Sequence, residues 1–139
     1  MADPRVDRLK HVPLFSHLSD KQLRFIATQV EELDFPAGRV LCREGHPGGD
    51  FFVMLSGAAD VTRGERHINT MREGDFFGEI ALVDGGERTA TVTTTSPSRC
   101  LVLGPSQFRN VVHQDGDLAY SIMRALCSRL RAAGSLPAD

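Results

Sequence analysis

The sequence predicts an α+β fold that is mainly β, with helices before and after the strands. Between Glu32 and Leu103, turn residues recur about every eight to twelve positions, as in a β-sandwich or barrel. Amphipathic helical patterns lie on both sides of this region. The chain has 139 residues, of which 41% are hydrophobic. This length and composition suit one domain with a real core.

The first 31 residues are expected to contain two helices, within residues 4–31. The segment VDRLKHVPLF predicts a short helix that ends near Pro13, because proline cannot continue a helix. Ser19 followed by Gln22 forms a capping-box pattern for the second helix. Apolar residues then recur at helical spacing at Leu23, Ile26, Ala27 and Val30.

Residues 32–104 read as a series of short strands separated by turns. Threonine and valine are frequent in TATVTTT and RCLVLG, as pleated strands favour. Many glycines fall between the strand segments, where a positive φ is often needed. The other expected strand segments are ELDF, RVLCREG, DFFVML, AADVTR and HINTM.

Two helices are expected in residues 105–133. The first is PSQFRNVVHQ, which opens with Pro105 near its start and is broken by Asp115 and Gly116. The second runs from Asp117 to about Ala133, with Leu118, Ala119, Ile122, Leu126 and Leu130 on one face. We therefore expect one domain over residues 1–134, and a disordered tail or the start of a linker at 135–139.

Composition excludes several classes of function. The formal net charge is −2, and no run of lysine or arginine suggests direct nucleic-acid binding or a membrane surface. The apolar runs are too short for a membrane segment, and the charged N-terminus does not resemble a signal peptide. Cys42, Cys100 and Cys127 are odd in number and form no CxxC pair. Reduced thiols and a cytoplasmic location are expected.

An enzyme is the less favoured interpretation. A small β-roll could be a metal-binding cupin with a histidine and glutamate site. However, the five histidines are scattered without an H-x-H pair, and no Ser-His-Asp or Cys-His grouping occurs. We therefore expect no catalytic residue, no metal and no cofactor.

The segment FFGEIALVDGGERTATV, residues 76–92, combines an acid and a base around a glycine pair. A helical turn that starts at Gly78 would present free backbone N–H groups to an anion. Arg88 could return across the Gly85-Gly86 loop and grip the same anion through two hydrogen bonds. Glu79 could accept a hydrogen bond from a neighbouring hydroxyl group. Alternatively, Glu79 and Arg88 form an ordinary surface ion pair, worth about 0–1 kcal/mol.

The same segment resembles the phosphate-binding cassette of the cyclic nucleotide-binding domain family. The resemblance rests on FGEIAL, a short variable loop and RTATV. It extends over nearly the whole chain through VPLFSHLSDKQL, FPAGRVLCREGHPGGDFFVMLSGAADV and FRNVV. It implies an eight-stranded jelly-roll β-roll with N-terminal helices and two C-terminal helices, the last of which can act as a lid.

The resemblance assigns roles to individual residues of this segment. Glu79 is expected to hold the ribose 2′-hydroxyl of a cyclic nucleotide, and Arg88 to pair with its cyclic phosphate. Thr89 would contact the phosphate and, in one orientation of the base, the 2-amino group of guanine. The ligand would be cyclic AMP or cyclic GMP, with cyclic AMP as the default. Further candidate contacts are Gly78 and the backbone N–H groups of Ile80, Ala81, Thr89 and Ala90.

The base pocket and lid depart from the pattern of the catabolite activator protein in this family. Ala133 and Gly134 fall where that protein carries a pair of hydroxyl residues that contact the base, so those hydrogen bonds are lacking. Phe108 and Leu118 are expected at the hinge of the C-terminal helices. Candidates for the lid are Cys127, Leu130 and Arg131, and candidates for the pocket wall are Val40, Val53 and Leu82. Core packing and a solvated helix face are the alternative roles of these residues.

The resulting functional hypothesis is a cyclic nucleotide sensor that couples ligand binding to movement of its C-terminal helices. No helix-turn-helix follows the last helix, so the output is expected from an unknown protein effector or a missing downstream domain. The last helix is also a candidate surface for a homodimer. The alternatives are a degenerate module that binds only a partner protein, and a regulatory fragment of a larger channel, transporter or enzyme.

Overall fold

The computed structural model describes residues 4–133, which form two compact units. One unit comprises residues 28–109, and the other combines residues 4–27 with residues 110–133. The first unit holds the β-strands and the second is helical. The predicted fold class, antiparallel strands with helices on both sides in the sequence, is confirmed.

The β unit contains two four-stranded antiparallel sheets. One has the order β1-β8-β3-β6 and the other has the order β2-β7-β4-β5. Strands that are distant in sequence pair directly, as in β1 with β8, where Leu33 lies opposite Cys100. The strand bounds are β1 Glu31–Phe35, β2 Val40–Cys42, β3 Phe51–Ser56, β4 Ala59–Arg63, β5 Arg66–Met71, β6 Phe76–Phe77, β7 Thr91–Thr94 and β8 Ser98–Leu103.

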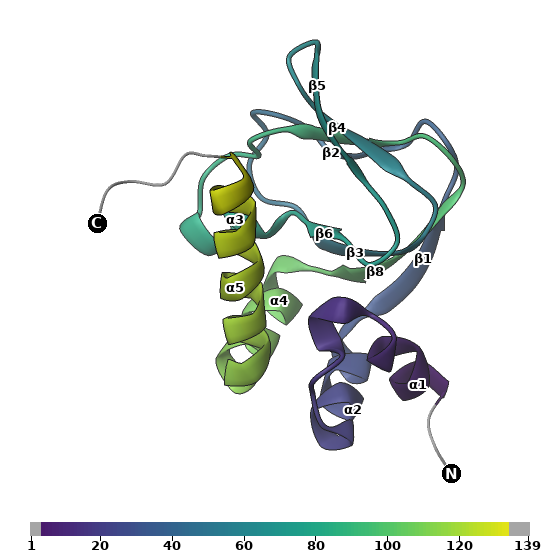
Figure 1. Cartoon of the computed structure of the whole chain (residues 1–139), viewed down its shortest axis with the longest axis vertical. Helices are drawn as coiled ribbons and strands as arrows, with labels where there is room; N and C mark the ends of the chain where they lie inside the picture. Colours follow the sequence, from purple (N-terminus) through teal and green to yellow (C-terminus); the bar gives the residue numbers. More distant parts are fainter. Residues whose placement is uncertain (1–3, 134–139) are drawn as a thin grey trace. The chain divides into compact units, whose positions relative to one another are not determined.

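The core of this unit lies between the two sheets, which face each other in Figure 1. Alternate residues of β3 point inward, and Phe52 stacks on Phe77 of β6 with ring centroids 4.9 Å apart. The same cluster includes Cys42, Met54, Ala59, Val61, Met71, Val92, Cys100 and Val102. Both sheets therefore close on one apolar interior, as in a jelly roll.

The opposite side of β3 carries a second apolar group. Phe51 lies with its ring centroid 5.7 Å from that of Phe76 and 5.0 Å from that of Phe108. Phe108 belongs to α4, Pro105–Gln114, whose first turns are part of the β unit. The contact between Phe51 and Phe108 holds the start of α4 against β3.

The helical unit contains α1 Pro4–Lys10, a 3-10 turn η1 at Pro13–Phe15, α5 Gly116–Ala133, most of α2 Asp20–Gln29 and the end of α4. The capping box at the start of α2 is confirmed. The Ser19 backbone N–H donates to Gln22 Oε1 at 2.8 Å, and the Gln22 N–H donates to Ser19 Oγ at 3.2 Å. Helix α1 ends three residues before Pro13, earlier than predicted, and proline opens the separate 3-10 turn.

The last helix begins at Gly116, one residue before the predicted start. Asp115 is its N-cap, because its Oδ1 accepts the backbone N–H of Leu118 at 3.1 Å. Leu118 and Ile122 are buried, whereas Leu130 is 47% exposed, so the predicted apolar face is only partly covered. Gly134 and the predicted tail at 135–139 lie outside the described residues. Within residues 4–133, the helices are all too short or too polar to cross a lipid bilayer.

Candidate functional site

Arg88 is buried at the centre of the predicted cassette. Its side chain is 7% exposed, and its guanidinium donates to the carbonyl of Gly78 at 2.6 Å and to that of Asp50 at 2.7 Å. Its backbone N–H also donates to the carbonyl of His46 at 2.9 Å, and its own carbonyl accepts from Gly45. The β2–β3 turn therefore holds both the main chain and the side chain of Arg88.

Two glycines make room for this guanidinium. Gly49 has φ +95° and Gly78 has φ +96°, a region that L side chains rarely adopt. A Cβ on Gly49 would collide with the Arg88 guanidinium, and one on Gly78 would lie 2.5 Å from the Asp50 carbonyl oxygen. The glycines that the sequence placed in turns thus have a second function, which is to let the backbone approach Arg88.

Glu79 is the first residue of α3, Glu79–Asp84, and is 2% exposed. Because Glu79 and Arg88 are both buried, the alternative of an ordinary surface ion pair is wrong. Helix α3 begins directly after Gly78, as predicted, and the first turn of an α-helix leaves its N–H groups without intrahelical partners. Ile80 and Ala81 lie in this turn, where their N–H groups add to the positive end of the helix.

Thr89 and Ala90 lie in a bend that precedes β7, so Thr89 is not a strand residue. The side chain of Thr89 is exposed. Its carbonyl accepts the Nε–H of Arg63 at 3.0 Å, which ties the bend to the end of β4. Sequence reasoning missed Arg63 because 26 residues separate it from Thr89 and it belongs to no motif.

A hollow of about 250 Å³ lies beside Arg88. Of the predicted wall residues, Val40 lines it, and sequence reasoning missed Cys42, Arg43 and His46. Burial raises the pKa of the Cys42 thiol to about 11, although the charge of Arg88 acts in the opposite direction and those of Glu79 and Asp50 add to the rise. These charges therefore lie within electrostatic range of one buried sulfur atom.

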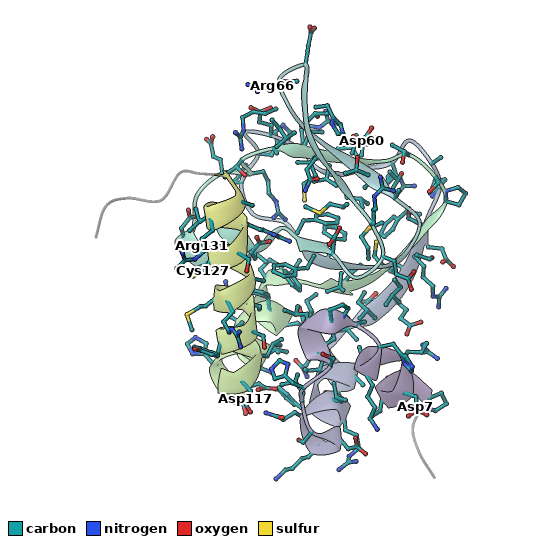
Figure 2. The ribbon with its side chains drawn as sticks, viewed as in Figure 1. Asp7, Asp60, Arg66, Asp117, Cys127 and Arg131 are labelled. Atoms are coloured by element: carbon teal, nitrogen blue, oxygen red, sulfur yellow. The ribbon has the colours of Figure 1, made fainter. Side chains whose placement is uncertain are left out.

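The remaining predicted residues are placed as follows. Val53 is 0% exposed and pairs with Phe76 and Leu101 within its sheet, on the opposite side of β3 from Phe52. Leu82 is half-buried on α3. Cys127 and Leu130 are exposed on α5, and Figure 2 shows Cys127 and Arg131 on the C-terminal half of that helix. These three belong to the helical unit, so their role in a lid stays a prediction.

This arrangement is suited to a ligand with an anionic group next to a hydroxyl group. The two carbonyls use two of the five N–H donors of the guanidinium, and the others can serve an anion. The carboxylate of Glu79 is an acceptor for a hydroxyl, and the first turn of α3 supplies further donors. Across residues 4–133, the structure holds no group of three or more His, Cys, Asp or Glu residues that could bind a metal ion.

Comparison with known proteins identifies the class of this domain. The model of the cyclic nucleotide-binding domain matches residues 32–115, which include the site and both sheets apart from Glu31. The chain therefore belongs to the cyclic nucleotide-binding domain family. This confirms the resemblance stated from the sequence.

Individual relatives are regulatory proteins. The cAMP-dependent protein kinase regulatory subunit of Hypocrea atroviridis is 35% identical over 104 residues, which are 75% of this chain and 22% of that protein. The CRP-like cAMP-activated global transcriptional regulator of Mycobacterium tuberculosis is 26% identical over 94% of this chain and 61% of that protein. The Thermus thermophilus catabolite activator protein has the same fold, with a TM-score of 0.78, 24% identity, and 88% of this chain and 60% of that chain covered. The chain thus spans about a quarter of the fungal subunits that it matches.

Proposed function

We propose that this chain binds a cyclic nucleotide and acts as a regulatory sensor rather than as an enzyme. Cyclic AMP is the default ligand, because the regulatory subunit and the transcriptional regulator that it resembles are described as cAMP-dependent and cAMP-activated. Cyclic GMP is the second candidate. The observation that supports the proposal best is the buried guanidinium of Arg88, which is held against the first turn of α3 beside the buried Glu79.

In the proposed complex, Arg88 pairs with the cyclic phosphate and Glu79 accepts from the ribose 2′-hydroxyl. The backbone N–H groups of Ile80, Ala81, Thr89 and Ala90 complete the phosphate site, and Gly78 contacts the ribose. Val40 would line the base pocket from β2, and we retain Val53 and Leu82 as candidates. Binding of the cyclic nucleotide is proposed to need no cofactor or metal.

Isothermal titration with cyclic AMP and cyclic GMP tests this assignment. We expect saturable binding of at least one of them, and Glu79→Gln should weaken it less than Arg88→Ala does, because an amide oxygen still accepts from a hydroxyl. Absence of heat at millimolar concentrations of both nucleotides would instead support the degenerate module that binds only a partner protein.

The sensing step would couple this site to the C-terminal helices within one domain, residues 1–134. A ligand can shift these helices only by its differential affinity for two of their positions. We propose Phe108 and Leu118 as hinge residues and Cys127, Leu130 and Arg131 as lid residues. If one of these lid candidates covers the base, its single mutation should raise the dissociation rate of the nucleotide.

The partner that receives the signal is proposed to be a protein effector or a further domain of a larger channel, transporter or enzyme. The net charge of −2 argues against direct contact of this domain with nucleic acid. The chain also contains three free cysteines, which favours a cytoplasmic location.

A homodimer through α5 is a further proposal. Tyr120, Met123 and Leu130 are exposed on this helix and, with Cys127, are spaced by three, four and three residues. This is the spacing of an a/d coiled-coil seam. Sedimentation analysis should give a dimer that Met123→Glu dissociates, and a monomeric wild-type chain would exclude the proposal.

A further inference from the structure

A second hollow, of about 440 Å³, lies in the helical unit between α2 and the junction of α4 with α5. None of its residues belongs to the site around Arg88. Asp115 forms part of its wall and is only 4% exposed. The lining residues are Lys21, Gln22, Phe25, Gln114, Asp115 and Gly116.

The two carboxylate oxygens of Asp115 have different surroundings. Oδ1 caps α5 by accepting the N–H of Leu118 at 3.1 Å, and it also accepts the side-chain amide of Gln22 at 3.1 Å. Oδ2 is buried and has no hydrogen-bond partner among the described residues. A buried acceptor without a donor is costly, so Oδ2 is a candidate acceptor for a donor that enters the hollow.

A neighbouring carboxylate favours a donor that carries a positive charge. Asp117, at the start of α5 (Figure 2), accepts the Gln22 side-chain amide through its Oδ2 at 2.8 Å. The Nε2 atom of Gln22 therefore lies within hydrogen-bond distance of both carboxylates. Lys21 and Asp115 of the lining balance in formal charge, so the neighbouring Asp117 leaves an excess of one negative charge.

A guanidinium group fits these surroundings better than an ammonium group. It has only donors, and its five N–H groups can serve Asp115 Oδ2 and a neighbouring carboxylate at once. It is also more weakly hydrated than an ammonium, so it loses less on entering a partly buried hollow. An ammonium is a compact and strongly hydrated charge that gains less from either contact.

We propose that this hollow binds an arginine side chain presented by a partner protein. The proposal goes beyond the sensor function, because it identifies a protein-docking site by its chemistry and involves no contact with a nucleotide. Asp115 would be the anchor of this site, with Asp117 as the second acidic group.

N-acetyl-L-arginine amide is a direct probe, with N-acetyl-L-lysine amide as the matched control at equal ionic strength. Amide NMR spectra of the whole chain, recorded without nucleotide, should show saturable shifts of Gly116 and of the Gln22 side chain. We expect a millimolar Kd for the arginine compound and binding of the lysine compound weaker by at least about threefold.

Asp115→Asn is the decisive variant. Asparagine is as good an N-cap as aspartate, so α5 should be retained while the anionic oxygen is lost. The arginine compound should then bind at least about tenfold more weakly, whereas Asp7→Asn, on the exposed surface of α1, should leave its Kd unchanged.

Three outcomes would overturn the proposal: no saturable shift up to about 100 mM of the arginine compound, equal binding of the lysine compound, or unchanged binding by Asp115→Asn. Because the experiment contains no nucleotide, these outcomes are independent of whether the site around Arg88 binds one.

Discussion

Replacing Arg88 with alanine is the sharpest test of the proposed phosphate site. The guanidinium is 7% exposed and is already oriented by its bonds of 2.6 and 2.7 Å to the carbonyls of Gly78 and Asp50. It would therefore bind the proposed phosphate with little further loss of side-chain entropy. Truncating one member of such a buried charged pair costs about 2–5 kcal/mol of binding free energy, which corresponds to a Kd raised about thirtyfold to several thousandfold.

The same substitution should also lower the stability of the unbound protein. Gly78 and Asp50 each lose a charged donor for their carbonyl oxygen, although the removal of a buried charge offsets part of this loss. We expect the free energy of unfolding to fall by about 1–3 kcal/mol. Chemical denaturation without nucleotide measures this effect separately from binding.

Titration calorimetry with cyclic AMP and cyclic GMP measures the change in affinity. Arg66→Ala is the control, because Arg66 is exposed at the tip of the β4–β5 hairpin (Figure 2) and its loss changes the net charge equally. An Arg88→Ala affinity within twofold of the wild type, or an equal loss in both variants, would refute the phosphate role. Arg88→Lys should retain most of the defect, since one ammonium cannot span both carbonyls and a phosphate.

Three further predictions concern the surroundings of the site. Thr89→Ala should weaken binding of cyclic GMP more than binding of cyclic AMP in calorimetry, and equal losses would mean that the hydroxyl contacts only the phosphate. Gly49→Ala should destabilise the fold by about 1–3 kcal/mol through its positive φ and also weaken nucleotide binding, because the new Cβ would displace the Arg88 guanidinium. Gly38→Ala has a similar φ of +84° but open space around it, and its N–H donates to Thr94 and not to Arg88, so it should lower stability alone; a matching loss of affinity would contradict the steric argument. Burial raises the pKa of Cys42 from 9.0 to about 11. The contribution of this thiol to stability should therefore be complete below pH 9 and be lost as the pH rises towards 11. Iodoacetamide at pH 8 should label the exposed Cys127 well before Cys42, as followed by mass spectrometry, and equal labelling rates would show that β2 opens readily.

The sequence by itself determined the features that depend on local pattern. The capping box of Ser19 and Gln22, the strand segments and the turn before α3 follow from spacing and residue type, and each formed within a few residues of its expected bounds. The functional pair, Glu79 and Arg88, was also accessible, because both lie in one short motif. Only the tertiary structure decided that they are buried, and the β2–β3 turn that bonds to Arg88 comes from another part of the chain.

Contacts between residues that are distant in the sequence determine the other features of the site. The Asp50 carbonyl lies 38 residues before Arg88, and Arg63 reaches Thr89 across 26 residues, so no local pattern could reveal either bond. The Asp115 oxygen that has no donor within residues 4–133 was equally inaccessible to prediction, because the sequence marked that residue only as a helix break. Periodicity specifies which faces are apolar, but the donors and acceptors that meet are chosen when the strands and helices pack.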